Sequence, residues 1–171
     1  DDSFSMHAGQ ILQISAPGLL GNDSDADGDA LQVIGVGVVG LQGTVAVAAD
    51  GGFSFTPTTG FLGQTSFSYT ASDGVGGTAQ GTVTIDVGNQ APELTSISDR
   101  NLLAGELLSL NLVAVDPDGV DTLTYSLLGG PSGVVLDAAT GALTWTAPYL
   151  DAQAAYTFTV GVDDGLGGSD Q

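Results

Sequence analysis

The chain has 171 residues, of which 42% are hydrophobic, and this is enough apolar side chain for one or two globular cores. Its 18 Asp and two Glu are balanced only by Arg100, because the chain has no Lys, and with His7 neutral the net charge is −19. A surface of this sign repels phosphate backbones and anionic lipid head groups, which excludes nucleic acid and membrane insertion as favoured interactions. Without cysteine, neither disulfides nor thiolate metal sites can stabilise the fold.

Short runs of alternating apolar and polar residues predict β-strands along the first half of the chain. They fall at 11–15, 45–47, 53–55, 67–71 and 78–87. Turn-forming sequences such as Asp50-Gly51-Gly52 and Asp73-Gly74 separate these runs. Period-two alternation places one face of each strand in a core and the other in water.

The same alternation continues through the second half of the chain, at 108–112, 123–127, 143–145 and 156–162. No stretch has helical periodicity over three turns, and no apolar run approaches the roughly 20 residues of a membrane span. About seven short strands in each half predict an all-β fold of two tandem immunoglobulin-like antiparallel β-sandwiches.

An internal repeat with an offset of 91 residues divides the chain. The segment Asp25-Ala-Asp27-Gly28 recurs as Asp116-Pro-Asp118-Gly119, and Phe67…Asp73-Gly74 recurs as Phe158…Asp164-Gly165. Because Pro92 favours an extended approach to the next strand, we expect domains at 1–88 and 89–171. The counterpart of the strand at 78–87 would begin at 169, so the second sandwich is expected to lack its last strand.

Acidic loops are expected to converge at one pole of each sandwich. In an immunoglobulin-like fold, the loops after the second and sixth strands lie at the same end as the N-terminus. In the first domain this end would hold Asp1 and Asp2 together with the candidate metal ligands Asp23, Asp25, Asp27, Asp29 and Asp73. In the second domain the candidates are Asn89, Asp116, Asp118, Asp121, Asp163 and Asp164. The second set is expected at the junction of the domains.

Such crowding of carboxylates predicts a bound cation. Two carboxylates about 5 Å apart repel by roughly 3 kcal/mol at an effective dielectric near 20. Calcium takes six to eight oxygen ligands in flexible geometry, whereas transition metals favour His or Cys. The run Asp23-x-Asp25-x-Asp27-Gly28 imitates an EF-hand loop, but its twelfth position is Ile34 and no helix flanks it. We therefore predict Ca²⁺ held between loops.

The first half, with Pro17-Gly-Leu-Leu-Gly-Asn-Asp-Ser-Asp-Ala-Asp-Gly-Asp29 and Gly51-Gly-Phe-Ser-Phe-Thr-Pro57, resembles the cadherin-like tandem repeats of the VCBS type. The second, with Asn89-Gln-Ala-Pro92 and Leu136-Asp-Ala-Ala-Thr-Gly-Ala-Leu-Thr-Trp145, is similar to dystroglycan-type cadherin-like domains. The resemblance implies large secreted or surface proteins of bacteria, stiffened by calcium at domain junctions. Carried over by position, it favours Asp116, Asp118 and Asp164 as ligands, then Asn89 and Asp163.

The resulting hypothesis is a calcium-stabilised spacer in cell-surface adhesion, extracellular, whose partners are neighbouring repeats of the same chain or fibre. Catalysis is not expected, because His7 is alone and no Cys or Lys accompanies it. Two alternatives stay open. A polysaccharide-binding module would use exposed aromatics, for which Tyr149 is the candidate, since Trp145 alternates with Leu143 and is predicted to be core. A filament subunit would complete its second sandwich with a donated strand.

Overall fold

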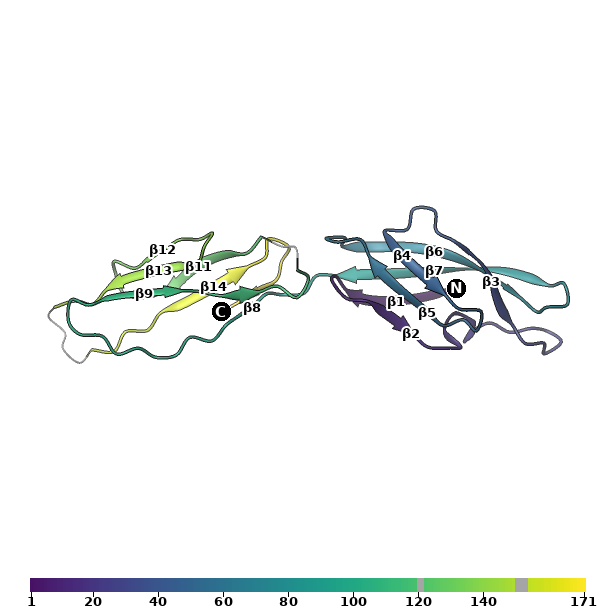
Figure 1. Cartoon of the computed structure of the whole chain (residues 1–171), viewed down its shortest axis with the longest axis horizontal. Coiled ribbons are helices and arrows are strands. Elements are labelled where there is room, and N and C mark those ends of the chain that lie inside the picture. Colours follow the sequence, from purple (N-terminus) through teal and green to yellow (C-terminus); the bar gives the residue numbers. More distant parts are fainter. Residues whose placement is uncertain (120–121, 150–153) are drawn as a thin grey trace. The chain divides into compact units, whose positions relative to one another are not determined.

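The structure, a computed structural model, describes residues 1–119, 122–149 and 154–171. The chain divides into two compact units, unit 1 (Asp1–Gly88) and unit 2 (Asn89–Gln171). Both are built from β-strands, as Figure 1 shows, so the predicted all-β class is confirmed. No helix in the described part of the chain is long and apolar enough to cross a membrane.

Unit 1 is a sandwich of two sheets. The larger sheet has the strand order β1 (Asp2–His7), β7 (Thr78–Gly88), β6 (Gly63–Ser72) and β3 (Gln32–Gly37). The smaller has the order β2 (Leu12–Ile14), β5 (Phe53–Pro57) and β4 (Gly43–Val47), and a 3-10 turn, η1 (Gly18–Leu20), follows β2.

One strand pair of unit 1 departs from the expected antiparallel arrangement. β1 pairs with β7 in parallel, with Asp2 opposite Val83 and His7 opposite Gly88. The other pairs of the described strands are antiparallel. A parallel pair needs a long crossover connection, and here the whole of the intervening unit supplies it. Alternation of apolar residues carries no strand direction, so the sequence alone could not reveal this pair.

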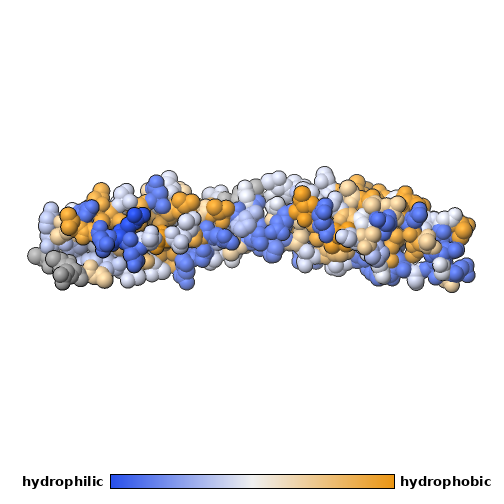
Figure 2. All heavy atoms as spheres, turned by 60° about the horizontal axis from the view of Figure 1, so that its bottom comes forward, coloured by the Kyte–Doolittle hydropathy of each residue, from blue (hydrophilic) through white to orange (hydrophobic). Residues whose placement is uncertain are grey.

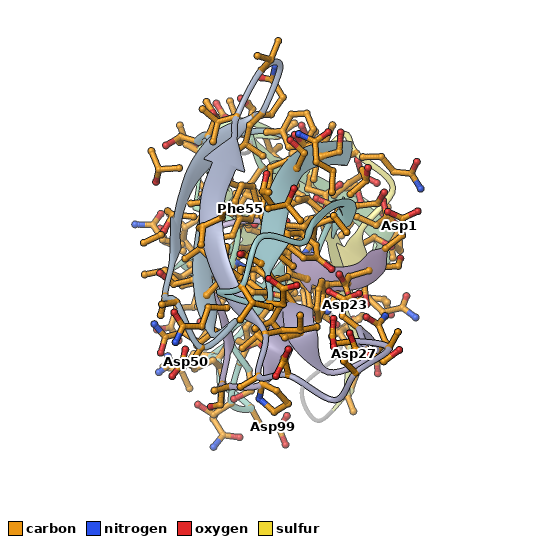
Figure 3. The ribbon with its side chains drawn as sticks, turned by 90° about the vertical axis from the view of Figure 1, so that its right-hand side faces the viewer. Asp1, Asp23, Asp27, Asp50, Phe55 and Asp99 are labelled. Carbon is orange, nitrogen blue, oxygen red and sulfur yellow. The ribbon has the colours of Figure 1, made fainter. Side chains whose placement is uncertain are left out.

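The core of unit 1 lies between the two sheets and follows the alternation of the strands. Phe55, Val83 and Ile85 are fully buried, and Phe55 lies within the body of the unit in Figure 3. The Phe53 ring makes edge-to-face contacts with Phe4 and Phe67, at centroid distances of 5.1 and 5.7 Å. These contacts join strands of both sheets and add to the free energy of apolar burial.

Unit 2 has the same design with shorter strands. One sheet has the order β12 (Val135–Leu136), β13 (Ala142–Thr146) and β9 (Leu107–Asn111). A second has the order β11 (Thr124–Gly129), β14 (Thr159–Asp163) and β15 (Ser169–Asp170), and β8 (Glu93–Leu94) pairs with β10 (Ala114–Val115).

Trp145 is central to the core of unit 2, as predicted from its alternation with Leu143. It is 4% exposed, and its Nε1 donates a 3.1 Å hydrogen bond to the Ser132 carbonyl oxygen. Its ring packs edge-to-face against Tyr156 and Phe158, at centroid distances of 4.9 and 5.4 Å. Because Trp145 is the only tryptophan of the chain, its fluorescence reports on unit 2 alone.

The last strand of unit 2 is present as the two residues of β15, which pair with Val162 and Asp163 of β14. The run predicted as a strand at 156–162 becomes β14 only from Thr159 onward. In unit 1 the corresponding β6 has ten residues and is paired along its whole length with β7.

Candidate metal centre

The first two residues of unit 2 bridge two acidic loops. Asn89 Nδ2 donates a 2.7 Å hydrogen bond to Asp164 Oδ2, in the loop after β14. The backbone N–H of Gln90 donates a 2.7 Å hydrogen bond to Asp118 Oδ2, in the loop after β10. The start of unit 2 is therefore tied to both loops that the repeat pattern singled out.

The Asp164 loop is held by its own carboxylate. Asp164 Oδ1 accepts hydrogen bonds from the backbone N–H groups of Leu166 (2.7 Å) and Gly168 (2.9 Å). The residue is 4% exposed. Burial raises the pKa of Asp164, but the bonds from Asn89, Leu166 and Gly168 lower it more, so its pKa lies below the usual range. The carboxylate therefore carries its charge at neutral pH.

Asp116 and Asp118 form a tight turn in the other loop. Asp116 Oδ1 accepts a 2.8 Å hydrogen bond from the backbone N–H of Asp118, and Gly119 follows with a φ of 77°. This turn requires a residue at Gly119 that tolerates the left-handed region. Asp118 is 5% exposed, so its charge lies inside the unit.

Three acceptor oxygens of this group are buried without a hydrogen-bond donor. They are Asn89 Oδ1, Asp116 Oδ2 and Asp118 Oδ1. A buried acceptor without a partner costs about 1–3 kcal/mol, and more when it is charged. Only a cation or a donor from outside can satisfy an acceptor, so the oxygens fit a hard metal ion such as calcium. No three Asp, Glu or His side chains of the described residues form a metal-binding group by themselves. The Asn89 amide would therefore have to take part.

At the pole of unit 1, hydrogen bonds connect Asp2 and Asp23 to their neighbours. Tyr69 Oη donates to Asp23 Oδ2 (2.7 Å) and lies 3.0 Å from the Leu19 carbonyl oxygen. Burial, then the hydrogen bond to Asp23, raises the pKa of Tyr69 far above its usual value. Asn22 Nδ2 donates to Asp2 Oδ1 (3.1 Å), and Asp2 Oδ2 is buried without a partner.

The other acidic candidates of unit 1 bond within their own loops. Asp25 Oδ1 accepts from the backbone N–H groups of Asp27 and Asp29, at 2.9 and 3.2 Å. Asp27 and Asp29 are exposed. Figure 3 shows Asp23 and Asp27 on the same side of the unit as Asp1, and Asp50 on the opposite side. No bond between these loops and Asp73 is found in the described chain, so the expected convergence is weaker here than in unit 2.

Asp73 repeats the loop geometry of Asp164 without its partner from the start of the unit. Asp73 Oδ1 accepts from the backbone N–H groups of Val75, Gly76 and Gly77 at 2.8 to 3.0 Å. These bonds, that of Val75 foremost, hold the pKa of Asp73 below its usual range. The repeat therefore preserves the turn in both units, while the added contact from Asn89 is found in unit 2.

The remaining predicted residues have separate positions. Asp163 is exposed, and its Oδ1 accepts a 2.8 Å hydrogen bond from the Gly165 backbone. Asp121 lies outside the described residues. Tyr149 is 81% exposed, and its ring lies over Gly105, where an added Cβ would meet the ring atoms. One exposed ring offers a single stacking surface.

Sequence reasoning missed two participants. The backbone N–H of Gln90 is one, and no residue type signals a main-chain donor. Gly168 is the other, because its Cα leaves room for the Asp164 carboxylate and lies against the Ala91 backbone. The repetition of glycine at the same place in Asp73-Gly-Val-Gly-Gly77 was a signal that could have identified Gly168.

Comparisons with known proteins agree with the observed fold. Residues 1–86 match the family model described as "Bacterial Ig domain", and residues 91–171 match the one described as "Putative Ig domain". No curated protein sequence matches the chain.

Solved structures that are similar to the chain include those of three proteins. They are the endo-fucoidan hydrolase MfFcnA4 from glycoside hydrolase family 107 (19% identity, TM-score 0.40), mouse cadherin-23 EC22-24 (17%, 0.41) and protocadherin gamma B2 extracellular cadherin domains 3-6 (21%, 0.38). The alignments cover 99%, 98% and 99% of this chain but 26%, 60% and 48% of those chains.

The expected class of tandem bacterial immunoglobulin-like repeats is thus confirmed by two adjacent family matches that fall within the two units. The chain belongs to the bacterial Ig domain family, whose model matches its first 86 residues, and carries a second Ig-type domain at residues 91–171.

Proposed function

We propose that the chain is a calcium-stabilised structural repeat of a large extracellular bacterial protein, a rigid spacer in cell-surface adhesion rather than an enzyme. The single observation that carries this proposal is the set of buried acceptors without donors, Asn89 Oδ1, Asp116 Oδ2 and Asp118 Oδ1. All three are hard oxygen atoms, and calcium prefers ligands of this kind.

Asn89, Asp116 and Asp118 would hold the ion through these oxygens, with main-chain carbonyls or water completing its coordination, and Asp164 would hold the Asn89 amide in place. Calcium supplies positive charge that offsets the repulsion of carboxylates buried in a low-dielectric environment. The chain's own residues hold the loops ready, because Asp164 and Asp116 already fix their turns through main-chain hydrogen bonds. Exposed Asp163 is a weaker candidate.

The mechanical consequence comes from the position of Asn89 in the chain. Gly88 is the last residue of unit 1 and Asn89 the first of unit 2. Fixing Asn89 and Gln90 to both acidic loops would restrict the backbone that connects the units. A series of such repeats would then form a stiff spacer, and its partners would be neighbouring repeats of the same chain or fibre.

The surface chemistry supports an extracellular location at the bacterial surface. The chain has a net charge of −19 and no cysteine, so it cannot be stabilised by disulfides. Bound calcium would stabilise it instead by neutralising carboxylates. Extracellular calcium modules bind with dissociation constants of about 0.1–1 mM. Sites of this affinity bind calcium outside cells and are empty inside them. The spacer would therefore become stiff after secretion.

Thermal unfolding followed by Trp145 fluorescence tests the proposal in unit 2. At ten times the dissociation constant, one calcium site adds about 1.4 kcal/mol to the free energy of unfolding. For a unit of this size the midpoint should rise by several degrees over the value in chelator, and magnesium should give less.

A matched pair of variants locates the effect. Asp118→Asn removes a buried charge from the candidate centre and should abolish the calcium-induced shift. Asp137→Asn removes a carboxylate whose hydrogen bonds, within the described residues, are to Ala139 and Thr140 of its own turn, and it should retain the shift. An equal calcium response in both variants would rule out the centre described here.

Polysaccharide binding is a second candidate because Tyr149 is 81% exposed. Retention of the chain on a polysaccharide in the presence of chelator, lost in Tyr149→Ala and kept in Tyr149→Phe, would favour it over the spacer. No retention would leave the calcium proposal as the better account.

A further inference from the structure

One edge strand in each unit exposes large apolar side chains. β3 is the last strand in the order of its sheet and pairs with β6, and β11 has the same place in unit 2, where it pairs with β14. Ile34 and Val36 of β3 are exposed, as are Leu127 and Leu128 of β11. Figure 2 shows hydrophobic residues reaching the surface of both units among hydrophilic ones.

This exposed edge belongs to the repeat. Leu127 lies 91 positions after Val36, and the two side chains are 38% and 41% exposed. Each strand also has an irregular register, between Val33 and Gly35 in β3 and between Leu127 and Gly129 in β11. Because the feature recurs at the repeat offset, it is a property of the fold rather than of one loop.

The two edges lack the charged side chains that usually protect sheet edges from pairing with other chains. Residues 30–49, which contain β3 and β4, hold no Asp, Glu, Lys or Arg. The same is true of residues 122–136, which contain β11 and β12. The 20 acidic residues of the chain lie outside both ranges, so these edges are neutral areas of a strongly negative molecule.

In unit 1 the apolar edge continues into the turn after β3. Val38 is exposed and Val39 is 99% exposed, and Figure 1 shows the turn between β3 and β4 projecting from the unit. At its other end the edge is bounded by Val33, whose backbone N–H donates a 2.9 Å hydrogen bond to the Ala49 carbonyl oxygen. Among the described strands, none pairs with the outer side of β3, so its backbone can accept another strand.

We propose that β3 is a self-association edge, which pairs antiparallel with β3 of a second copy of this chain. A two-fold axis at Val36 would place Ile34 of each copy opposite Val38 of the other, so apolar side chains would meet across the pair. The two four-stranded sheets would become one continuous sheet. A two-fold contact of this kind is closed, because each copy uses up the edge of the other, and its product is a dimer.

A second copy fits this edge because of the charge distribution. Two chains that each carry −19 repel wherever their acidic loops approach, whereas the β3 edge brings neutral backbone and apolar side chains together. The repulsion that remains predicts a weak dimer, which salt strengthens by screening. The pairing does not depend on the calcium centre, whose residues are in unit 2, so measurements in chelator separate the two.

Analytical ultracentrifugation of the full chain, in chelator and high salt, tests the pairing. The parent chain should shift reversibly from 16.9 kDa toward twice that mass as its concentration rises. In Ile34→Glu/Val38→Glu each new carboxylate would lie opposite another. Charges within a contact are screened less than those at the surface, so the dissociation constant should rise at least about tenfold. In Ile34→Glu/Val38→Lys each Glu would lie opposite a Lys, and the dimer should remain.

Ile97→Glu/Leu103→Glu is the control, because it adds the same two charges to exposed apolar residues that lie outside the strands. It should dimerise as the parent does. Hydrogen exchange locates the contact. The β3 amides that exchange fastest in the monomer should slow at least about tenfold on dimerisation, and those of β4 should not.

A parent chain that is monomeric at every concentration would overturn the proposal and leave the edge to an extended segment of another protein. Equal dimerisation of the Glu/Glu variant and the control would also overturn it, because another surface would then hold the copies together. Equal weakening of both β3 variants would overturn the two-fold pairing at Val36.

Discussion

The side-chain amide of Asn89 donates a 2.7 Å hydrogen bond to Asp164 Oδ2, while Asn89 Oδ1 is buried without a donor. The amide thus contacts an anion through its nitrogen and leaves its oxygen free for a cation. The bond joins residues that are 75 positions apart and ties the first residue of unit 2 to the loop after β14.

Replacing Asn89 by Asp should separate stability without calcium from stability with calcium. In chelator, a second carboxylate beside Asp164 loses the hydrogen bond and adds repulsion on the order of 3 kcal/mol, so unit 2 should be less stable. With calcium, the added charge should strengthen binding and enlarge the shift of the Trp145 unfolding midpoint.

Asn101→Asp is the control, because Asn101 is exposed and the same charge is added away from the acidic loops. It should change neither the stability in chelator nor the calcium shift by a comparable amount. A calcium shift in Asn89→Asp no larger than in the parent chain would argue against Asn89 as a ligand.

Gly168→Ala should disrupt the same loop by steric means. A Cβ at this position would collide with Asp164 Oδ2 and lie 2.7 Å from the Ala91 Cα. We expect a loss of about 1–3 kcal/mol in unit 2 and a smaller calcium shift, measured by denaturant unfolding with Trp145 fluorescence. Gly130→Ala is the control, since its Cβ would be 3.5 Å or more from its neighbours. Equal losses in both variants would contradict the role given to Gly168.

The fold could be predicted in outline because alternation has a direct physical meaning. Leu143 and Trp145 share a face of β13, and both are buried as their spacing predicts. The 91-residue offset predicted two copies of one sandwich because the same loop and strand motifs recur at that spacing. The parallel pairing of β1 and β7 was not predictable, because it depends on how the whole of unit 1 closes rather than on any local pattern.

The candidate centre was predicted only in part. Asp116, Asp118 and Asp164 lie in the loops that topology assigns to one pole, and hydrogen bonds link two of these loops to the start of unit 2. The similar spacing of Asp25 and Asp27 suggested an equal site in unit 1, yet Asp27 is exposed there. The spacing of the Asp residues determines the local turn, whereas the burial of their carboxylates depends on the segment that packs over that turn.

Tyr69→Phe should destabilise unit 1 while leaving unit 2 unchanged. The Tyr69 hydroxyl donates its single proton to Asp23 Oδ2 and lies 3.0 Å from the carbonyl oxygen of fully buried Leu19. Without the hydroxyl, the partly buried Asp23 carboxylate loses this donor, which should cost about 1–3 kcal/mol. Calorimetry should show a lower transition for unit 1, and Trp145 fluorescence an unaltered one for unit 2. Tyr149→Phe, at an exposed position, is the control, and a comparable loss there would refute the argument.

Acid should weaken unit 2 partly through Asp170. The hydrogen bond from the Leu94 backbone, at 2.8 Å, lowers the pKa of Asp170, and the bond from the Gln171 backbone lowers it further. A carboxyl with a lower pKa in the folded state stabilises it above the unfolded pKa of about 3.9. That contribution is lost as the pH falls through the folded value.

The measurement is denaturant unfolding in chelator at pH 6 and pH 3, followed by Trp145 fluorescence. Asp170→Asn keeps an acceptor for the Leu94 N–H but has no charge to lose, so its stability should fall less between these pH values than that of the parent. Asp99→Asn changes the net charge equally and should fall as much as the parent, because Asp99 is exposed and bonds to neither Leu94 nor Gln171. If both variants lost the same stability, the β8–β15 contact would not be a source of the acid sensitivity, and general charge repulsion would explain it instead.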